Sequence, residues 1–363
     1  MAAEVVQLRG GRRRTVRRLP RLRGPHRRGL RRLAGLLAMP ALLVATAAVL
    51  VLAVQPRTLA SAMSRLDLPV ALLALGVTLA LYLAQGVRWH RLLRAVGSRL
   101  RLRDSLLLNA AGQTITAIVP LGDLMRAVFA SEASGTEFGR AAATVTVQEL
   151  AYTLLLVLSS LPVVLQLHLG VGAVLLVVGC VATVVAILVV EPVYRVVHDS
   201  AARLPLLRGL LRQLDGLHES TADLLRRPDT LRWTLLDAAR AALAVTVLWL
   251  IVRGLEPGVL GWWQAGFVMA LSYVGGAVSL VPGGAGADEA STVGLLVLVH
   301  VDPATAAAAA LCHRVLTTGV AAVIGGAAYL VARRRFQLGS LLTVRAQDRP
   351  DADARPPALR TAA

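Results

Sequence analysis

The sequence predicts an all-α fold: a polytopic membrane helix bundle with two broken or re-entrant helical hairpins in an inverted-topology repeat. Hydrophobic residues make up 56% of the chain and charged residues only 17%, whereas soluble domains contain about 45–50% apolar residues. The apolar residues gather in runs that suit the roughly 30 Å of hydrocarbon in a bilayer. Two of these stretches break, at Pro120 and at Pro282, and carboxylates follow both breaks.

The net charge of +18 does not indicate a nucleic-acid partner, because the arginines flank apolar runs and twelve of them precede Leu33. This distribution follows the positive-inside rule and favours contact with anionic lipid. We therefore expect residues 1–32 to form a basic cytoplasmic arm that binds the anionic membrane surface.

The first membrane helix is expected at Leu33–Val54, which contains 22 residues without a charge. That run is too long for the core of a signal peptide, so an uncleaved helix is predicted. A second helix at Val70–Val87 leads into six arginines between Arg88 and Arg103. Their number places its end in the cytoplasm.

Two short segments follow, Ser105–Val119 and Leu121–Ser131, joined at Pro120. At 1.5 Å per residue neither reaches across roughly 30 Å of hydrocarbon, so together they predict a re-entrant hairpin from the cytoplasmic side. Ala141–Leu165 then crosses outward and Val171–Val190 returns.

Residues 192–232 form the one sizeable loop, and their seven arginines place it in the cytoplasm. The leucines in its middle recur at helical spacing and predict an amphipathic helix at the membrane surface. They are Leu204, Leu207, Leu211, Leu214 and Leu217. Trp233–Val252 then crosses outward.

The second broken stretch joins Trp262–Val281 to Ala285–His300 through Pro282-Gly283-Gly284. Counting crossings, it enters and leaves on the outer side, as either a re-entrant hairpin or a full down-and-up pair. Ala304–Val331 returns to a run of three arginines, which places both termini in the cytoplasm. Residues 335–363 are polar and are expected to be a disordered tail.

The membrane domain, residues 33–334, therefore contains two similar units, about residues 105–190 and 262–331. Each has a break, then a carboxylate, then a long apolar helix with a charge near its middle. The charges are Glu149 in the first unit and Arg314 in the second. Because the units start from opposite sides, they predict an inverted repeat of the kind found in secondary transporters.

Charges inside the membrane mark the candidate site, because each costs roughly 2.5–3.5 kcal/mol at the bilayer centre. They should face one another, a cavity or a ligand. The candidate substrate-binding residues are Asp123, Arg126, Glu149, Gly283, Gly284, Gly286, Asp288, Glu289 and Arg314. No catalytic residue, cofactor motif or metal-ligand cluster is predicted.

Three alternatives stay open at these positions. Glu149 and Arg314 either form an ion pair that only registers helices or line a polar cavity. The amides of Gly283–Ala287 open a helix and so favour an anion such as phosphate, or the segment is a tight turn capped by a carboxylate. Arg126 either pairs with Asp123 or binds phosphate.

Two further charges, Asp237 and Arg240, lie one turn apart near a predicted helix end. Local pairing with each other and snorkelling of the arginine explain them without a functional role.

The run Pro282-Gly283-Gly284-Ala285-Gly286-Ala287-Asp288-Glu289 resembles the P-x-G-x-G-x-x-E motif of the lysylphosphatidylglycerol synthase transmembrane region, a flippase-like family. Arg314 fits that family's buried arginine. Arg88-Trp89-x-x-Leu92-Leu93 and Gly122-Asp123-x-x-Arg126 look like its first-half motifs. The resemblance covers about Leu33 to Val331.

The resemblance implies a bacterial plasma-membrane protein that transports a phospholipid or lipid-linked substrate between leaflets. Well-known members carry a soluble aminoacyl transferase domain, for which this chain has no room, so lysyl transfer is not expected. The alternatives are a membrane-embedded glycosyltransferase that uses polyprenyl-phosphate sugars and a non-transporting membrane scaffold. The chain has no P-loop, so direct use of ATP is not expected.

Overall fold

The computed structural model describes residues 64–116, 122–166, 190–202, 218–279 and 286–338, with scattered positions between 172 and 186. Several predicted segments therefore lie outside the described residues. They are the basic arm 1–32, the helix Leu33–Val54, most of Val171–Val190, the leucine-spaced segment 204–217, both proline breaks and the tail beyond residue 338.

Every regular element of the described residues is helical, which confirms the all-α fold. The elements are α3 (Leu68–Ala95), α4 (Leu102–Thr116), α5 (Leu124–Ser134), α6 (Phe138–Gln166), α8 (Glu191–Ala202), α10 (Pro228–Leu255), α11 (Trp262–Val278), α12 (Ala287–Leu298), α13 (Pro303–Arg314), the π-helical turn η2 (Val315–Gly319) and α14 (Val320–Phe336).

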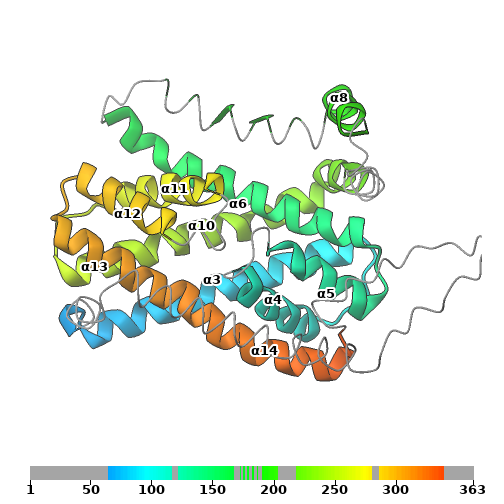
Figure 1. The fold of residues 1–363 in the computed structure, drawn as a ribbon, viewed down its shortest axis with the longest axis horizontal. Coiled ribbons are helices and arrows are strands. Elements are labelled where there is room, and N and C mark those ends of the chain that lie inside the picture. The colour runs from blue at the N-terminus through cyan, green and yellow to red at the C-terminus, as the bar shows by residue number, and fades with distance from the viewer. Residues whose placement is uncertain are drawn as a thin grey trace, which may run out of the picture.

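Four helical stretches of the described chain are long and apolar enough to cross a membrane. They are α3, α6, α10 and the continuous stretch Pro303–Phe336, which α13, η2 and α14 form together. The protein is therefore a multi-pass membrane protein. In Figure 1 these helices run along the long axis of the molecule, with α3 against α10 and α6 against α11.

The predicted end of the second helix, at Val87, is wrong, because α3 continues to Ala95. Arginine interrupts a hydrophobic run but is a good helix former. Within α3, Arg88 forms a buried ion pair with Asp237 of α10, and the Arg91 guanidinium lies 4.3 Å from the ring centre of Trp233. Partners on α10 thus accommodate the charges along the end of α3.

The first hairpin, α4 and α5, starts and returns at the end of the bundle where α14 terminates. Asp104, in the first turn of α4, pairs with Arg335 in the last turn of α14 at 2.7 Å. With 15 and 11 residues, the two arms are about 22 and 16 Å long, less than the roughly 30 Å of hydrocarbon. Neither arm is therefore long enough to span a membrane, and the re-entrant path from the cytoplasmic side stays a prediction.

The second hairpin, α11 and α12, starts from the opposite end. Only residues 256–261 separate the end of α10 from α11, and the indole N–H of Trp262, the first residue of α11, donates to Thr246 in the second half of α10 at 3.1 Å. The arms have 17 and 12 residues, or about 26 and 18 Å, which favours a re-entrant hairpin over a full crossing pair. Figure 1 shows the two hairpins in opposite halves of the molecule. An inverted repeat requires this arrangement, and the repeat itself stays a prediction.

The first hairpin packs closely on α14 at Gly325. A Cβ atom added there would lie 2.2 Å from Thr114 Oγ1 and 2.3 Å from the carbonyl oxygen of Ala110, both in α4. The Thr114 hydroxyl lies 3.3 Å from the carbonyl oxygen of Ala322 and donates to it. Glycine thus lets α4 and α14 approach, as small residues do between membrane helices.

Gly325→Ala should therefore destabilise the protein by about 1–3 kcal/mol, the typical cost of overpacking a well-packed contact. Gly326→Ala is the matched control, because nothing lies within 4 Å of its added Cβ. Both variants gain the same helix propensity, so their difference in thermal unfolding temperature in detergent isolates the steric contact. Equal melting of the two variants would contradict the packing of α4 on α14.

Candidate functional site

Glu149 forms the centre of a group of charges inside the bundle. It lies 11 residues into α6, about 16 Å along the helix. Arg126 of α5 donates through Nη2 to its Oε1 at 2.7 Å, and Arg240 of α10 donates through Nη1 to both carboxylate oxygens at 3.1 Å. We call Asp123, Arg126, Glu149 and Arg240 the Glu149 cluster. Three helices each contribute a charged side chain to it, and Asp123 directly precedes α5.

Arg126 is fully buried and is held by polar groups on several sides. Its Nη1 donates to Asn109 Oδ1 at 3.1 Å and to Gln148 Oε1 at 3.2 Å, while Nη2 also pairs with Asp123 at 3.1 Å. Gly112 of α4 makes the room, since a Cβ there would lie 2.2 Å from Arg126 Cγ. Of the two alternatives for this arginine, the structure shows pairing with Asp123.

Tyrosines complete the surroundings of Glu149. The Arg240 guanidinium lies 3.9 Å from the ring centre of Tyr152, a cation–π contact. The hydroxyl of Tyr273 in α11 donates to Glu149 Oε2 at 3.5 Å, and the rings of Tyr152 and Tyr273 meet edge to face at 5.4 Å. Through Tyr273 the second hairpin reaches the charges that the first hairpin helps to hold.

The second group, Asp288, Glu289 and Arg314, is called the Arg314 cluster. Arg314, at the end of α13, places Nε 3.1 Å from Glu289 Oε1 and Nη1 3.7 Å from Asp288 Oδ2. Glu289 Oε2 also accepts the backbone N–H of Gly286 at 2.6 Å, which caps α12. Gly286 has φ of +82°, a left-handed conformation that favours glycine. Gly283 and Gly284 lie outside the described residues.

The two clusters are neighbours. Helix α3 contacts the surroundings of both: the side-chain amide of Gln148, next to Glu149, donates to the carbonyl oxygen of Gln85 in α3 at 2.8 Å. The Tyr82 hydroxyl donates to the carbonyl oxygen of Thr317 at 3.2 Å. Thr317 lies in η2, the π-helical turn that directly follows Arg314. Helix α3 therefore connects the residues that adjoin the two clusters.

The ion pair considered between Glu149 and Arg314 is not present, because nearer partners neutralise both side chains. The expected local pairing of Asp237 with Arg240 is also wrong. Asp237 pairs with Arg88 at 2.8 Å. The reason is depth: α10 begins at Pro228, inside the predicted loop, so Arg240 lies about 18 Å along the helix, too deep to snorkel.

The carboxylates of both clusters are more exposed than the arginines. The side chains of Asp123 and Asp288 are 30% and 32% exposed, whereas those of Arg126 and Arg314 are 0% and 5% exposed. The accessible surface of the site thus offers mainly hydrogen-bond acceptors, with guanidinium groups behind them. An ammonium or hydroxyl group complements such a surface. Among the described residues, no group of His, Cys, Asp and Glu could hold a metal ion.

Comparison with protein families identifies a match over most of the chain. The family model described as the lysylphosphatidylglycerol synthase TM region matches residues 33–325. Comparison with curated proteins gives no match. The matched range includes both clusters and both hairpins.

The Arg88–Asp237 pair supports a stability prediction, because both side chains are at most 1% exposed. Asp237→Ala leaves an uncompensated buried cation and should cost about 3–5 kcal/mol. Arg88→Met combined with Asp237→Leu should recover most of that loss, because a buried pair can be replaced by apolar side chains. Thermal unfolding in detergent measures both, and a double variant as unstable as Asp237→Ala would contradict a simple pair.

Proposed function

The chain belongs to the family of lysylphosphatidylglycerol synthase transmembrane regions, and from this premise we propose that it transports a polar-headgroup phospholipid between leaflets. One observation carries the proposal. The Glu149 cluster draws charged side chains from α5, α6 and α10, and Tyr273 from α11, into the interior of an apolar bundle.

The energetic cost of this cluster favours a role beyond holding helices together. Each charge costs roughly 2.5–3.5 kcal/mol at the bilayer centre before pairing. Well-packed apolar residues often replace a buried ion network at no loss of stability. The partial exposure of the Asp123 and Glu149 side chains, 30% and 18%, further suits groups that meet a ligand.

We infer that substrate exchanges with the resting ion pairs. A headgroup ammonium or hydroxyl would bind the Glu149 and Asp123 carboxylates, which are the accessible partners. The guanidinium of Arg240, released from Glu149, would then pair with the lipid phosphate. A headgroup that carries both a donor and a phosphate replaces both halves of the opened pair, so no charge is left uncompensated in the membrane.

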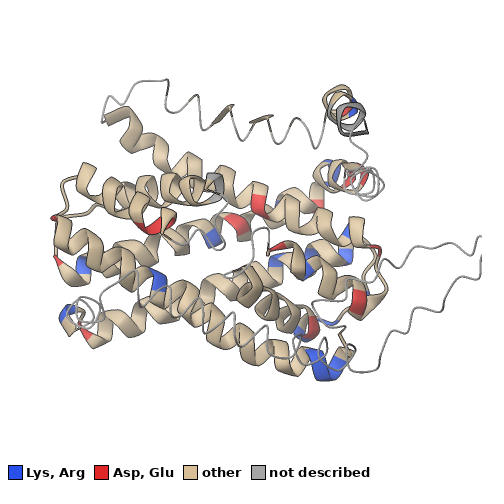
Figure 2. Ribbon diagram, viewed as in Figure 1, with Lys and Arg blue, Asp and Glu red and all other residues tan. Residues whose placement is uncertain are grey.

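The opposed hairpins support alternating access. The first hairpin starts from one end of the bundle and the second from the other, and each brings its charges to mid-depth. Rocking of one unit against the other would expose the site to the two leaflets in turn. Figure 2 shows arginines gathered at the end where α14 terminates. The positive-inside rule makes that end cytoplasmic, and the family leads us to place the protein in a bacterial plasma membrane.

In this proposal the protein acts on lipid without chemical conversion. One measurement distinguishes a lipid transporter from a membrane-embedded glycosyltransferase, because only the enzyme would turn over a polyprenyl-phosphate sugar. A scaffold would neither flip a lipid nor turn one over.

Glu149→Gln should reduce flipping of a fluorescent aminophospholipid in proteoliposomes. Loss of one charge-assisted hydrogen bond costs about 1.5–3 kcal/mol, or roughly tenfold to a hundredfold in rate if the interaction forms in the transition state. Dithionite quenching of the outer-leaflet probe measures the rate.

Glu137→Gln is the matched control, because Glu137 is 66% exposed and pairs only with Arg140 among the ion pairs of the described residues. It should flip lipid at the rate of the unsubstituted protein. Unchanged flipping in Glu149→Gln combined with Arg314→Ala would overturn the roles assigned to both clusters.

A further inference from the structure

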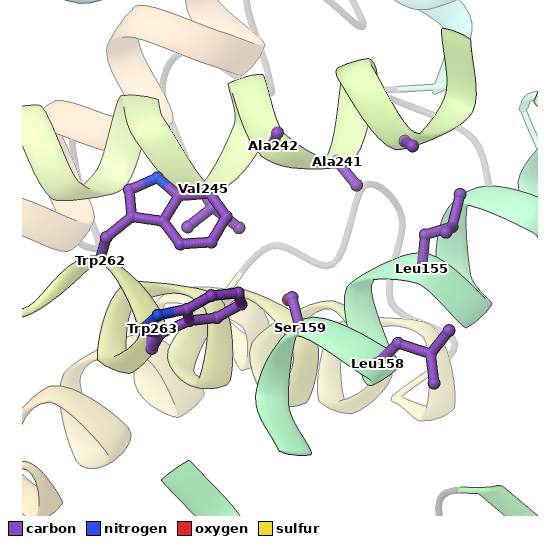
Figure 3. A pocket seen from close by; sticks show the side chains of 9 residues that line it. Leu155, Leu158, Ser159, Ala241, Ala242, Val245, Trp262 and Trp263 are labelled. Carbon is purple, nitrogen blue, oxygen red and sulfur yellow. The ribbon is translucent and has the colours of Figure 1, made fainter. Parts of the chain in front are cut away.

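A pocket of about 260 Å³ lies between α6, α10 and the start of α11. Three residues of α6, four of α10 and the adjacent Trp262 and Trp263 line it. Figure 3 shows the two indole rings on one side and leucine side chains of α6 on the other. None of its lining residues belongs to either charge cluster.

The lining suits hydrocarbon rather than a headgroup. Eight of the nine side chains are apolar, and Ser159 carries the one hydroxyl. That hydroxyl donates to the carbonyl oxygen of Leu156 on its own helix at 2.6 Å, and the indole N–H of Trp262 donates to Thr246 at 3.1 Å. These two groups are satisfied within the protein and the lining contains no charged side chain, so the pocket has little to offer a charged ligand.

The mouth of the pocket lies on the surface of two membrane-spanning helices. Leu158 of α6 is 48% exposed and Trp263 is 54% exposed, and α6 and α10 both qualify as membrane spans. At this surface the surrounding medium is hydrocarbon rather than water. The molecules with access to the pocket are therefore membrane lipids, and the part that fits is an acyl chain.

The pocket continues from the Glu149 cluster along the same two helices. Its α6 residues follow Glu149 by 6 to 10 positions, about 9–15 Å along the helix axis. Its α10 residues include Ala241 and Ala242, which directly follow Arg240. A lipid with its headgroup at the cluster would thus have this pocket within the reach of its chains.

We propose that this pocket binds a segment of one acyl chain of the lipid whose headgroup occupies the Glu149 cluster. The inference rests on the proposed function for the headgroup site. An apolar cavity of roughly 150 Å³ holds benzene, so this pocket accommodates several methylene groups and leaves the rest of the chain in the bilayer. An acyl chain gains little hydrophobic free energy when it moves from the bilayer into the pocket, because both surroundings are apolar. The headgroup that binds the Glu149 cluster therefore decides which lipid occupies the pocket.

Photolabelling tests the proposal. The full chain is reconstituted in phosphatidylglycerol and phosphatidylethanolamine vesicles that contain a trace of phospholipid with a diazirine in its acyl chain. After irradiation, mass spectrometry maps the labelled peptides. Adducts are expected on the lining residues of α6, α10 and α11.

Ala242→Phe should remove these adducts, because Ala242 lines the pocket and an added ring fills it. Ala239→Phe is the matched control: Ala239 is exposed, lies one turn earlier on α10 and does not line the pocket. It should keep the adducts. If both variants melt like the unsubstituted protein and label equally, the pocket does not hold an acyl chain.

Labelling of Glu149→Gln tests the link to the headgroup site. Adducts at the pocket should fall when the carboxylate is neutralised, and full retention would overturn the assignment of the chain to a cluster-bound lipid. Failure of the proposed function has a different signature. In that case the unsubstituted protein labels at the pocket and loses the label in Ala242→Phe, but does not flip the probe lipid.

Discussion

The neutralisation of Glu149 is the interaction on which the rest of the structure depends. A carboxylate about 16 Å along a membrane helix is costly unless it is paired, and the cations that pair with Glu149 come from other helices. Arg126 and Arg240 meet this need from α5 and α10. These two ion pairs in turn fix how α5 and α10 lie against α6. Neutralising Glu149 and packing α5 and α10 against α6 therefore depend on the same contacts.

Broken helices follow from this constraint. A continuous helix at α4 and α5 would carry its polar residues past the level of Glu149. The two arms instead lie side by side, so Asn109 on α4 and Arg126 on α5 meet at 3.1 Å. Gly112 allows that approach because it has no Cβ. The second hairpin brings Asp288 and Glu289 to Arg314 in the same manner from the opposite end.

Composition and pattern sufficed to predict the helical class, the hairpins and the lone charges of the site. Asp123, Glu149 and Arg314 are conspicuous because each interrupts an apolar run. Arg240 was not predicted as a site residue, because its depth depends on a helix start at Pro228. A proline next to arginines is equally typical of a loop. The tyrosines around Glu149 were missed for another reason. A single neutral polar residue in an apolar run carries little signal, and only tertiary packing reveals that Tyr273 points at a carboxylate.

The π-helical turn after Arg314 ties the second cluster to the helix beside the first. A π-turn departs from the regular hydrogen-bond ladder, and such bulges are frequent at functional sites. Here the carbonyl oxygen of Thr317 accepts from Tyr82 of α3, and one turn further along α3 the backbone carbonyl of Gln85 accepts from Gln148, next to Glu149. A displacement of Arg314 with its turn must therefore either break the Tyr82 hydrogen bond or carry α3 with it. In the second case the movement reaches Gln148, which adjoins Glu149, so α3 couples the position of one cluster to that of the other.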